Sequence, residues 1–363
     1  MSQGDPSKQS GAQYDTYRAI LEDDIAAYIA YIQTATRAQY GDDAALGSEA
    51  FLQVLAGGKR LRGVLTMAGY ELCGGQNWAM IIQAARAIEM LHAYILIIDD
   101  IEDESPRRRG HPAAHVQLAG YHRRHHLKGR AAHTGLSVAV NAAIAGAHAA
   151  QVVLANLDAD PYLRLSALSI TNRTLAITAH GQTSEILLSA RRKLPAEADL
   201  DRILEWKTAL YSVTNPLHVG MVLAGADCHA TDAITPFATH VGKVYQLQND
   251  LEDIFGSSTA DIPRAEDIRG GKLNLLIYYA LQHALPADSA LLQRSLGNPR
   301  LTASAIRRCR AIIQQSGAQS WVQQLIDTHI QKAQDSLRTA AQSNWSEAIV
   351  RFLYELADMC KPH

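Results

Sequence analysis

The sequence lacks the features of a disulfide-rich, nucleic-acid-binding or β-sheet protein. Its 363 residues include only four cysteines. They form no CxxC pair, so we expect reduced thiols and no structural zinc. Lys plus Arg number 34 against 36 Asp plus Glu, and this near-neutral balance argues against a nucleic-acid-binding protein. Aromatic residues are only 6%, which favours helices over a β-sandwich or barrel.

The N-terminus lacks the apolar core of a signal peptide. Residues 1–15 are polar and contain Gly and Pro, so we predict a loose tail there and a folded domain over residues 16–363. Two stretches without Asp, Glu, Lys or Arg, 136–157 and 208–226, are long enough to span a bilayer. Their polar residues and Asn215-Pro216 favour buried bundle helices instead. We therefore expect a cytoplasmic protein with no stable membrane insertion.

Apolar residues recur at helical spacing through most of the chain. No run alternates with a period of two, and no linker rich in Pro, Gly and Ser divides the sequence. The pattern therefore predicts one all-α domain. The segments expected to be helical are 17–39, 80–103, 163–188, 200–223, 238–255 and the chain from 273 to 356.

Two acidic clusters with matching spacing follow apolar segments. In the first, Asp99-Asp100-Ile101-Glu102-Asp103, Asp99 and Asp103 share a helix face, where like charges repel. A Mg²⁺ ion between them would relieve that repulsion, although a solvated acidic helix end is the alternative. The second cluster reads Asn249-Asp250-Leu251-Glu252-Asp253. Two such clusters favour several Mg²⁺ ions around one diphosphate.

Two basic clusters complement the acidic ones. The first is Gly57-Gly58-Lys59-Arg60-Leu61-Arg62, and the second, residues 107–110, follows the first acidic cluster. Arg forks match phosphate oxygens, although each cluster alone is equally consistent with a solvated surface patch. We interpret residues 122–126 as a surface loop. Acidic metal sites, cationic phosphate sites and an apolar helical scaffold together favour a diphosphate with an apolar tail.

These motifs resemble the trans-isoprenyl diphosphate synthase (polyprenyl synthetase) family, in its short-chain form. The resemblance runs through GGKRLR (57–62), DDIEDESPRRRG (99–110), GQTSEI (181–186), Lys207-Thr208, VYQLQNDLED (244–253) and DIRGGK (267–272). It implies a single-domain isoprenoid-synthase helical bundle around a central active-site cavity, and a homodimer. It also implies an enzyme that condenses an allylic diphosphate with isopentenyl diphosphate.

The resemblance implies roles for individual residues. The metal ligands would be Asp99, Asp100, Asp103, Asn249, Asp250 and Asp253, with three Mg²⁺ ions expected and Mn²⁺ as a substitute. Isopentenyl diphosphate would bind Lys59, Arg62, His92 and Arg109. The allylic diphosphate would bind Arg108, Lys207 and Lys272. Lys207, Thr208 and Gln246 would form the catalytic set, with Thr208 and Gln246 beside the developing carbocation.

Two positions refine this hypothesis. Asn249 stands where the family has Asp, and an amide binds Mg²⁺ without charge, so one ion is expected to bind more weakly. Tyr94 and Ile95 lie about one helical turn before Asp99. In the family a bulky residue there limits chain growth, so we predict a C15–C20 product. The alternatives are a class I terpene cyclase-like lyase and a catalytically weakened partner subunit of a prenyl synthase.

Overall fold

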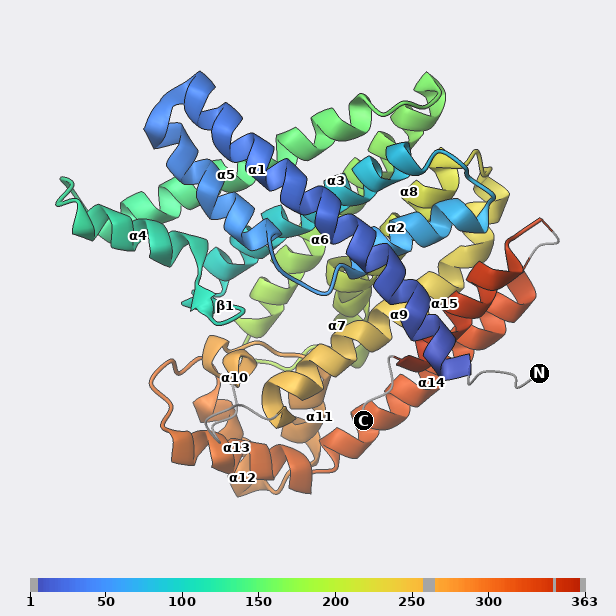
Figure 1. Ribbon diagram of the computed structural model, residues 1–363. Coiled ribbons are helices and arrows are strands. Elements are labelled where there is room, and N and C mark those ends of the chain that lie inside the picture. Colours follow the sequence, from blue (N-terminus) through green and yellow to red (C-terminus); the bar gives the residue numbers. More distant parts are fainter. Residues whose placement is uncertain (1–5, 257–264, 342–343, 360–363) are drawn as a thin grey trace. The chain divides into compact units, whose positions relative to one another are not determined.

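The computed structural model describes residues 6–256, 265–341 and 344–359, and these residues are overwhelmingly helical (Figure 1). The prediction of an all-α protein is confirmed. The helices are α1 (Pro6–Leu55), α2 (Leu61–Leu72), α3 (Trp78–Glu102), α4 (Ala114–Arg124), α5 (Ala131–Ala155), α6 (Pro161–Ser189), α7 (Glu197–Ile203), the π-helix η1 (Leu204–Thr214), α8 (Asn215–Leu223), α9 (Cys228–Phe255), α10 (Glu266–Gly270), α11 (Leu275–His283), α12 (Pro286–Ser295), α13 (Ala303–Gln315), α14 (Ala318–Ala340) and α15 (Glu347–Met359).

The chain divides into two compact units, where the sequence predicted one domain. Unit 1 comprises Met1–Ser169 and Pro216–Ala226, and unit 2 comprises Ile170–Asn215 and Asp227–His363. Helix α1 begins at Pro6, inside the segment predicted as a loose tail, and residues 1–5 of that tail lie outside the described residues. The sequence shows no linker because the chain passes between the units within and between helices.

Unit 1 is built around α3, which packs against α1, α2 and α5. Asn77 caps the start of α3 by accepting a hydrogen bond from the Met80 amide. Helices α2 and α8 approach closely, because a Cβ atom on Gly220 would lie 2.1 Å from the Thr66 carbonyl oxygen. The buried residues of α3 up to Ile97 are apolar apart from Glu89, and the helix then ends in the first acidic cluster.

Unit 2 is built around α9, which packs against α14 and η1. An apolar core of this unit includes Val244, Leu247 and Leu251 of α9 together with Leu276 and Ile277 of α11. These leucines and valines recur at three- and four-residue spacing on one face of α9. The same helix carries the second acidic cluster.

The segment 200–223, predicted as one helical block, is instead broken into α7, the π-helix η1 and α8. Pro216 has no amide hydrogen for the Ser212 carbonyl four residues earlier, so a regular α-helical pattern cannot continue through it. The backbones of α6 and α9 also pack closely against η1 at Gly181 and Gly242. A Cβ atom on Gly181 would lie 2.6 Å from the Lys207 nitrogen, and one on Gly242 would lie 2.5 Å from the Ala209 Cα.

Two helices among the described residues are long and apolar enough to cross a bilayer, judged by length and composition. They are α3 and α5. Within the most apolar 18-residue segment of each helix, 56% of α3 and 39% of α5 is buried inside the protein. The second overlaps the uncharged stretch 136–157 singled out in the sequence. The described cysteines, Cys73, Cys228 and Cys309, form no disulfide.

Candidate active site

A short hairpin in unit 1 turns the chain back onto the first acidic cluster. Strand β1 (Arg107–Arg108) pairs antiparallel with β2 (His111–Pro112). The turn residues Arg109 and Gly110 have φ angles of 51° and 82°, as a type I′ turn requires. Arg108 and Arg109 therefore contact different groups: Arg108 the first acidic cluster, and Arg109 the segment around Gly57 and Gly58.

Arg108 forms ion pairs with the first two aspartates of the cluster. Its guanidinium lies 3.2 Å from Asp99 Oδ2 and donates two hydrogen bonds to Asp100 Oδ1. Asp100 is 1% exposed, and its Oδ2 atom is buried with no hydrogen-bond partner among the described residues. Burial raises the pKa of Asp100, against the pull of Arg108 and helped by repulsion from Asp99 and Asp103. An uncompensated buried carboxylate oxygen fits a divalent cation.

Arg109 lies against the double glycine that ends the loop after α1. A Cβ atom on Gly57 or Gly58 would lie 2.9 or 2.7 Å from the Arg109 guanidinium. Gly58 has φ 126°, a conformation that L side chains rarely adopt. The guanidinium also donates a hydrogen bond to the Val54 carbonyl at 3.2 Å. The two glycines therefore leave the space in which the Arg109 cation lies.

The sequence analysis expected Lys59, Arg62, His92 and Arg109 to bind the same diphosphate. In unit 1, several arginine side chains make the surroundings of His92 electropositive. Burial lowers the pKa of His92 well below its ordinary value, and the guanidiniums of Arg62, Arg109, Arg108 and Arg60 lower it further. A neutral imidazole among several fixed cations is an environment that would stabilise a polyanion.

Arg60 differs from the neighbouring Lys59 because its charge is already compensated. It is 2% exposed, and its guanidinium lies 2.9 Å from Glu22 Oε1 and 3.6 Å from Glu89 Oε2. Glu89 also accepts a hydrogen bond from the Gly63 amide at 2.8 Å. Arg60 therefore fixes the loop, whereas Lys59 is exposed and forms no ion pair with the described part of the chain.

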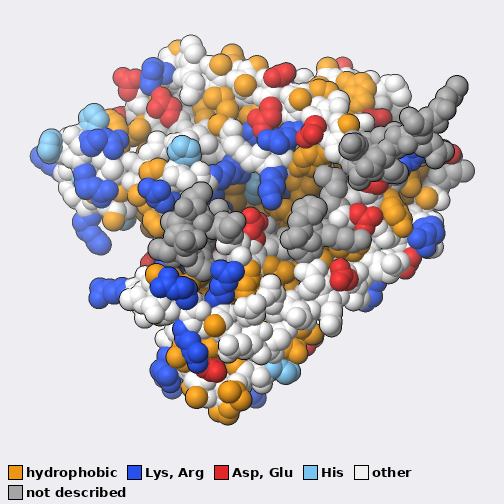
Figure 2. Space-filling model, turned by 60° about the horizontal axis from the view of Figure 1, so that its bottom comes forward, with side chains coloured by type: hydrophobic (Ala, Val, Ile, Leu, Met, Phe, Trp, Pro, Cys, Tyr) orange, Lys and Arg blue, Asp and Glu red, His pale blue; other side chains and the backbone are white. Residues whose placement is uncertain are grey.

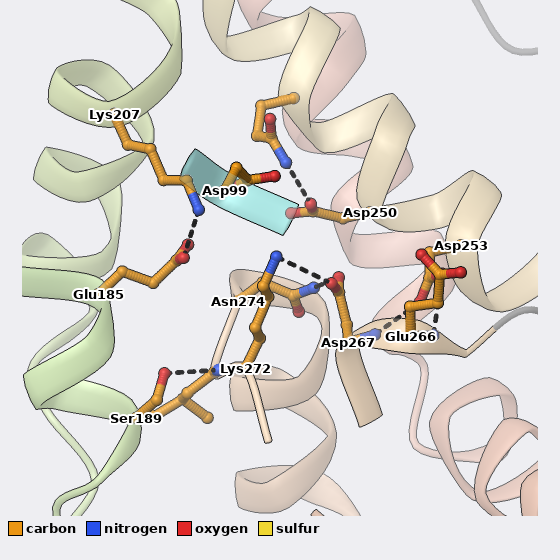
Figure 3. A network of polar contacts seen from close by, with 12 residues as sticks. Asp99, Glu185, Ser189, Lys207, Asp250, Asp253, Glu266, Asp267, Lys272 and Asn274 are labelled. Carbon is orange, nitrogen blue, oxygen red and sulfur yellow. Dashed lines mark hydrogen bonds and ion pairs between the residues drawn. The ribbon is translucent and has the colours of Figure 1, made fainter. Parts of the chain in front are cut away.

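The second acidic cluster lies in unit 2 within a network of polar contacts (Figure 3). Thr208 Oγ1 donates to Gln246 Oε1 at 3.0 Å, and Gln246 Nε2 donates to Asp250 Oδ1 at 2.7 Å. Lys207, on η1, pairs with Glu185 of α6 at 2.5 Å. The wide turns of a π-helix often mark functional sites, and here they carry both Lys207 and Thr208.

Buried carboxylates crowd this network. Burial raises the pKa of Asp250 well above its ordinary value, and the nearby Asp267 and Glu185 charges raise it further. Burial, with repulsion from Asp253 and Glu185, raises the pKa of Asp267 to about 7 against the pull of Lys272. Each carboxylate thus resists carrying its charge, and a divalent cation would relieve that cost.

Asp253 is held by the loop that follows it. Its two carboxylate oxygens accept hydrogen bonds from the Glu266 and Asp267 amides at 3.0 and 3.1 Å. Lys272 Nζ lies 3.8 Å from Asp267, and Asn274 donates to the same carboxylate at 2.9 Å. The DIRGGK motif is therefore the partner of the second acidic cluster.

A narrow pocket of about 50 Å³ opens within unit 2 beside these groups. Its polar wall includes Lys207, Gln246 and Asp267, and its other wall includes Leu204 and Leu275. Charged and leucine-lined walls therefore lie side by side here, in a space well below the roughly 300–1,000 Å³ of a typical ligand pocket.

No three His, Cys, Asp or Glu side chains within the described ranges lie close enough to hold a metal ion by themselves. The donor chemistry nevertheless fits Mg²⁺, which takes oxygen ligands, keeps several waters and is completed by substrate phosphate. Asp100 in unit 1 and Asp250 in unit 2 supply the buried oxygens. Asn249 lies half-buried on α9.

Sequence reasoning assigned no role to Glu185 or Asp267, although both lie inside motifs that carried the resemblance. Their signal was weak because neither belongs to an acidic cluster in the sequence. The structure shows that Glu185 pairs with Lys207 and that Asp267 joins Lys272 to the Asp253 loop. Tyr94 and Ile95 lie half-buried on α3, and their role in product length stays a prediction.

The fold and this site together define an all-α enzyme with paired acidic and basic motifs. The family model described as polyprenyl synthetase matches residues 45–313. The chain therefore belongs to the polyprenyl synthetase family and is a trans-prenyltransferase, as the motifs predicted.

Relatives and solved structures agree with this assignment. The geranylgeranyl diphosphate synthase of Sulfolobus acidocaldarius is 27% identical over 87% of this chain and 91% of its own. A short chain isoprenyl diphosphate synthase of Methanothermobacter thermautotrophicus is 26% identical over 82% and 85%. A Corynebacterium glutamicum geranylgeranyl pyrophosphate synthase, solved with isoprenyl diphosphate and magnesium, superposes with a TM-score of 0.88 and 25% identity over 95% of this chain and 98% of that chain. These comparisons give no support to the cyclase or partner-subunit alternatives.

Proposed function

We propose that the protein condenses an allylic diphosphate with isopentenyl diphosphate to give a short-chain, C15–C20, trans-prenyl diphosphate. The observation that carries this proposal is the pairing of motif carboxylates with motif cations in both units, as in Arg108 with Asp100 and Lys272 with Asp267. A polyanionic substrate accompanied by divalent cations can satisfy both partners of such pairs.

In unit 1, Lys59, Arg62, His92 and Arg109 are proposed to bind isopentenyl diphosphate. The neutral His92 ring can donate a hydrogen bond without adding charge. Arg108 is proposed to leave its carboxylates for the allylic diphosphate, and Asp99, Asp100 and Asp103 then turn to metal. An arginine fork suits this exchange because it binds carboxylate and phosphate oxygens with the same geometry.

In unit 2, Lys207 and Lys272 are proposed to bind the allylic diphosphate. The carbon–oxygen bond to that diphosphate breaks, the isopentenyl double bond attacks the allylic cation, and a proton is lost. Thr208 and Gln246 are proposed to lie beside this cation. The Gln246 amide is held in one orientation because its oxygen accepts from Thr208 and its nitrogen donates to Asp250. Fixed dipoles of this kind stabilise charge that develops in the transition state.

Magnesium is proposed as the metal, with three ions per site and Mn²⁺ as a substitute. Asn249, Asp250 and Asp253 would hold it in unit 2, as the three aspartates would in unit 1. When bound, Mg²⁺ neutralises the charge of the departing diphosphate. The solved Corynebacterium glutamicum structure containing magnesium and isoprenyl diphosphate supports this proposal.

We also propose a homodimer and a cytoplasmic location. Helix α5 exposes Leu136, Ile144 and Val152 by 42%, 46% and 60%. Successive members of this set are eight residues apart, so each is turned about 80° from the one before it, and together they follow a wide strip around the exposed side of the helix. A second copy of this chain would cover these exposed apolar side chains, and α5 then needs no membrane.

The test is an assay of the purified protein with Mg²⁺, labelled isopentenyl diphosphate and a panel of allylic diphosphates. We expect labelled C15–C20 diphosphates, identified by mass spectrometry. Asp103→Asn should lower the rate by at least a hundredfold, whereas Glu102→Gln, at the exposed neighbour, should stay near wild type. Hydrocarbon formed without isopentenyl diphosphate would indicate a cyclase, and no turnover on any substrate would refute the proposal.

A further inference from the structure

A cationic surface that the proposed reaction does not use lies at the junction of α4 and α5. Between Glu104 and Asp158 the sequence contains no acidic residue. Residues 123–130, which we call the α4–α5 loop, are all exposed. The loop carries four permanent cations, Arg123, Arg124, Lys128 and Arg130. Figure 2 shows Lys, Arg and His side chains gathered at the left-hand end of the view, where Figure 1 places the end of α4.

These cations differ from those of the active site in having no compensating charge. None of the four forms an ion pair with the described part of the chain, whereas Arg108, Lys207 and Lys272 all do. Because the whole chain has a net charge of −2, the remainder of the protein is negatively charged. The α4–α5 loop therefore presents a localised positive surface to an anionic partner.

An exposed leucine lies among these charges. Leu127 is 47% exposed, and contacts of the loop hold its backbone in place. The Leu127 amide donates to the His122 carbonyl at 3.1 Å, His122 Nε2 lies 3.1 Å from the Lys128 carbonyl oxygen, and the rings of Tyr121 and His125 stack at 4.0 Å. The leucine therefore stays on the surface among the cations.

We propose that the α4–α5 loop docks the protein on an anionic lipid surface. Cations gather at the charged headgroups, and one apolar side chain enters the interface, as in proteins that bind bilayers peripherally. Nucleic acid fits less well, because single strands require stacking aromatics, and the only aromatic among residues 114–133, Tyr121, already stacks on His125. The docking is independent of the prenyl-transfer chemistry and requires no membrane-spanning helix.

The test is flotation of the full-length protein with vesicles of phosphatidylcholine, alone or mixed with phosphatidylglycerol. We expect binding only to the mixed vesicles, and release at high salt. Arg124→Gln with Lys128→Gln should weaken binding about thirtyfold, because each cation near an anionic surface contributes a factor of about five. Leu127→Ser should weaken binding to the mixed vesicles at low salt, because it removes the apolar side chain that enters the interface. Arg191→Gln with Arg192→Gln, an exposed pair in unit 2, is the matched control and should bind like wild type.

Circular dichroism confirms that each variant folds, and elongation of labelled isopentenyl diphosphate in solution should be unchanged by the loop variants. Vesicle binding therefore tests the lipid proposal, and the elongation assay tests the proposed reaction, so that either can fail without the other. Equal binding to both vesicle types, no binding to either, or full binding by the loop variants would overturn it. Salt-sensitive binding to duplex or single-stranded RNA without vesicle binding would also overturn it, in favour of a nucleic-acid surface.

Discussion

At the residue scale, the space above Gly58 determines where the Arg109 cation lies. Gly58 has φ 126°, and a Cβ atom there would lie 2.7 Å from the Arg109 guanidinium. We predict that Gly58→Ala raises KM for isopentenyl diphosphate by about tenfold, since losing one charged hydrogen bond costs roughly 1.5–3 kcal/mol. Steady-state kinetics would show the change in KM.

Gly74→Ala is the matched control for this substitution. Gly74 also has a positive φ, 78°, but a Cβ atom there would meet nothing within 4 Å. It should therefore lower stability by about 1 kcal/mol through backbone strain and leave KM unchanged. An equal rise in KM in both variants would show that strain, rather than the displaced guanidinium, is responsible.

Tyr94 provides a second prediction at this scale. It precedes Asp99 by five residues on α3, so the two lie about one turn apart. Tyr94→Ala removes the bulk proposed to stop chain growth, and products should lengthen by one or more C5 units. Mass spectrometry of the products would show this. Tyr28→Ala, at another half-buried tyrosine of unit 1, should leave the product unchanged, and an unchanged product from Tyr94→Ala would remove Tyr94 from this role.

At the element scale, the contact between α9 and α14 contains a histidine pair. His240 Nδ1 lies 2.9 Å from His329 Nδ1. Burial is the main cause that lowers the pKa of His329 to about 4. The nearby His240, Lys243 and Lys332 lower this pKa further, and the Asp201 carboxylate opposes them. Both rings are therefore neutral in the folded protein near neutral pH. The helix that carries the second acidic cluster thus packs through a contact that protonation would disrupt.

This pair predicts a pH dependence of stability. The pKa of an unfolded histidine is about 6.5, so below that pH the unfolded chain binds a proton that the folded protein excludes. The free energy of unfolding should therefore fall between pH 6.5 and 4, by on the order of 1 kcal/mol, because partial exposure reduces the effect. Urea titrations at several pH values would measure this fall.

His329→Gln should flatten this dependence, and His148→Asn, at an exposed position of unit 1, should leave it unchanged. If His329→Gln kept the full slope between pH 4 and 6.5, groups other than the α9–α14 pair would be responsible.

The π-helix η1 is a second feature at the scale of the element. Pro216 is visible in the sequence, but the close backbone packing at Gly181 and Gly242 is tertiary, so the sequence did not predict the π-helix.

At the scale of the whole molecule, metal and diphosphate should stabilise the protein together. No three ligating side chains among the described residues form a complete ion site, so phosphate oxygens must complete the coordination. Mg²⁺ with inorganic diphosphate should raise Tm by several degrees, corresponding to about 3 kcal/mol at a hundredfold excess over Kd. Differential scanning fluorimetry would measure the shift.

The controls for this prediction are Mg²⁺ alone, diphosphate alone, and both with excess EDTA. Each should give a much smaller shift than the pair, because neither component alone satisfies both the buried carboxylates and the motif cations. A full shift with Mg²⁺ alone would contradict the prediction, since it would require a complete site built from side chains.

The sequence by itself determined the helical class and the chemistry of the motifs. Helical periodicity is local, so apolar spacing predicted α3 and the C-terminal part of α9, although α9 begins at Cys228 rather than at residue 238. The acidic clusters indicated oxygen ligands for a hard cation. The resemblance added the family, since ordered motifs from residue 57 to residue 272 are specific even though each alone is weak. The role of Asp267 was missed because an aspartate in the first turn of a short helix, outside the two acidic clusters, has no local signature that indicates a ligand site.

Only the tertiary structure decided how charge is arranged. The burial that leaves an Asp100 oxygen without a partner, the pairing of Glu185 with Lys207, and the raised pKa of Asp267 depend on contacts between distant segments. The pKa of a carboxyl depends on its desolvation and its neighbours, neither of which is a property of the residue type. For the same reason, the sequence showed that residues 122–130 are basic, while the structure showed that the four cations of the α4–α5 loop have no acidic partners among the described residues.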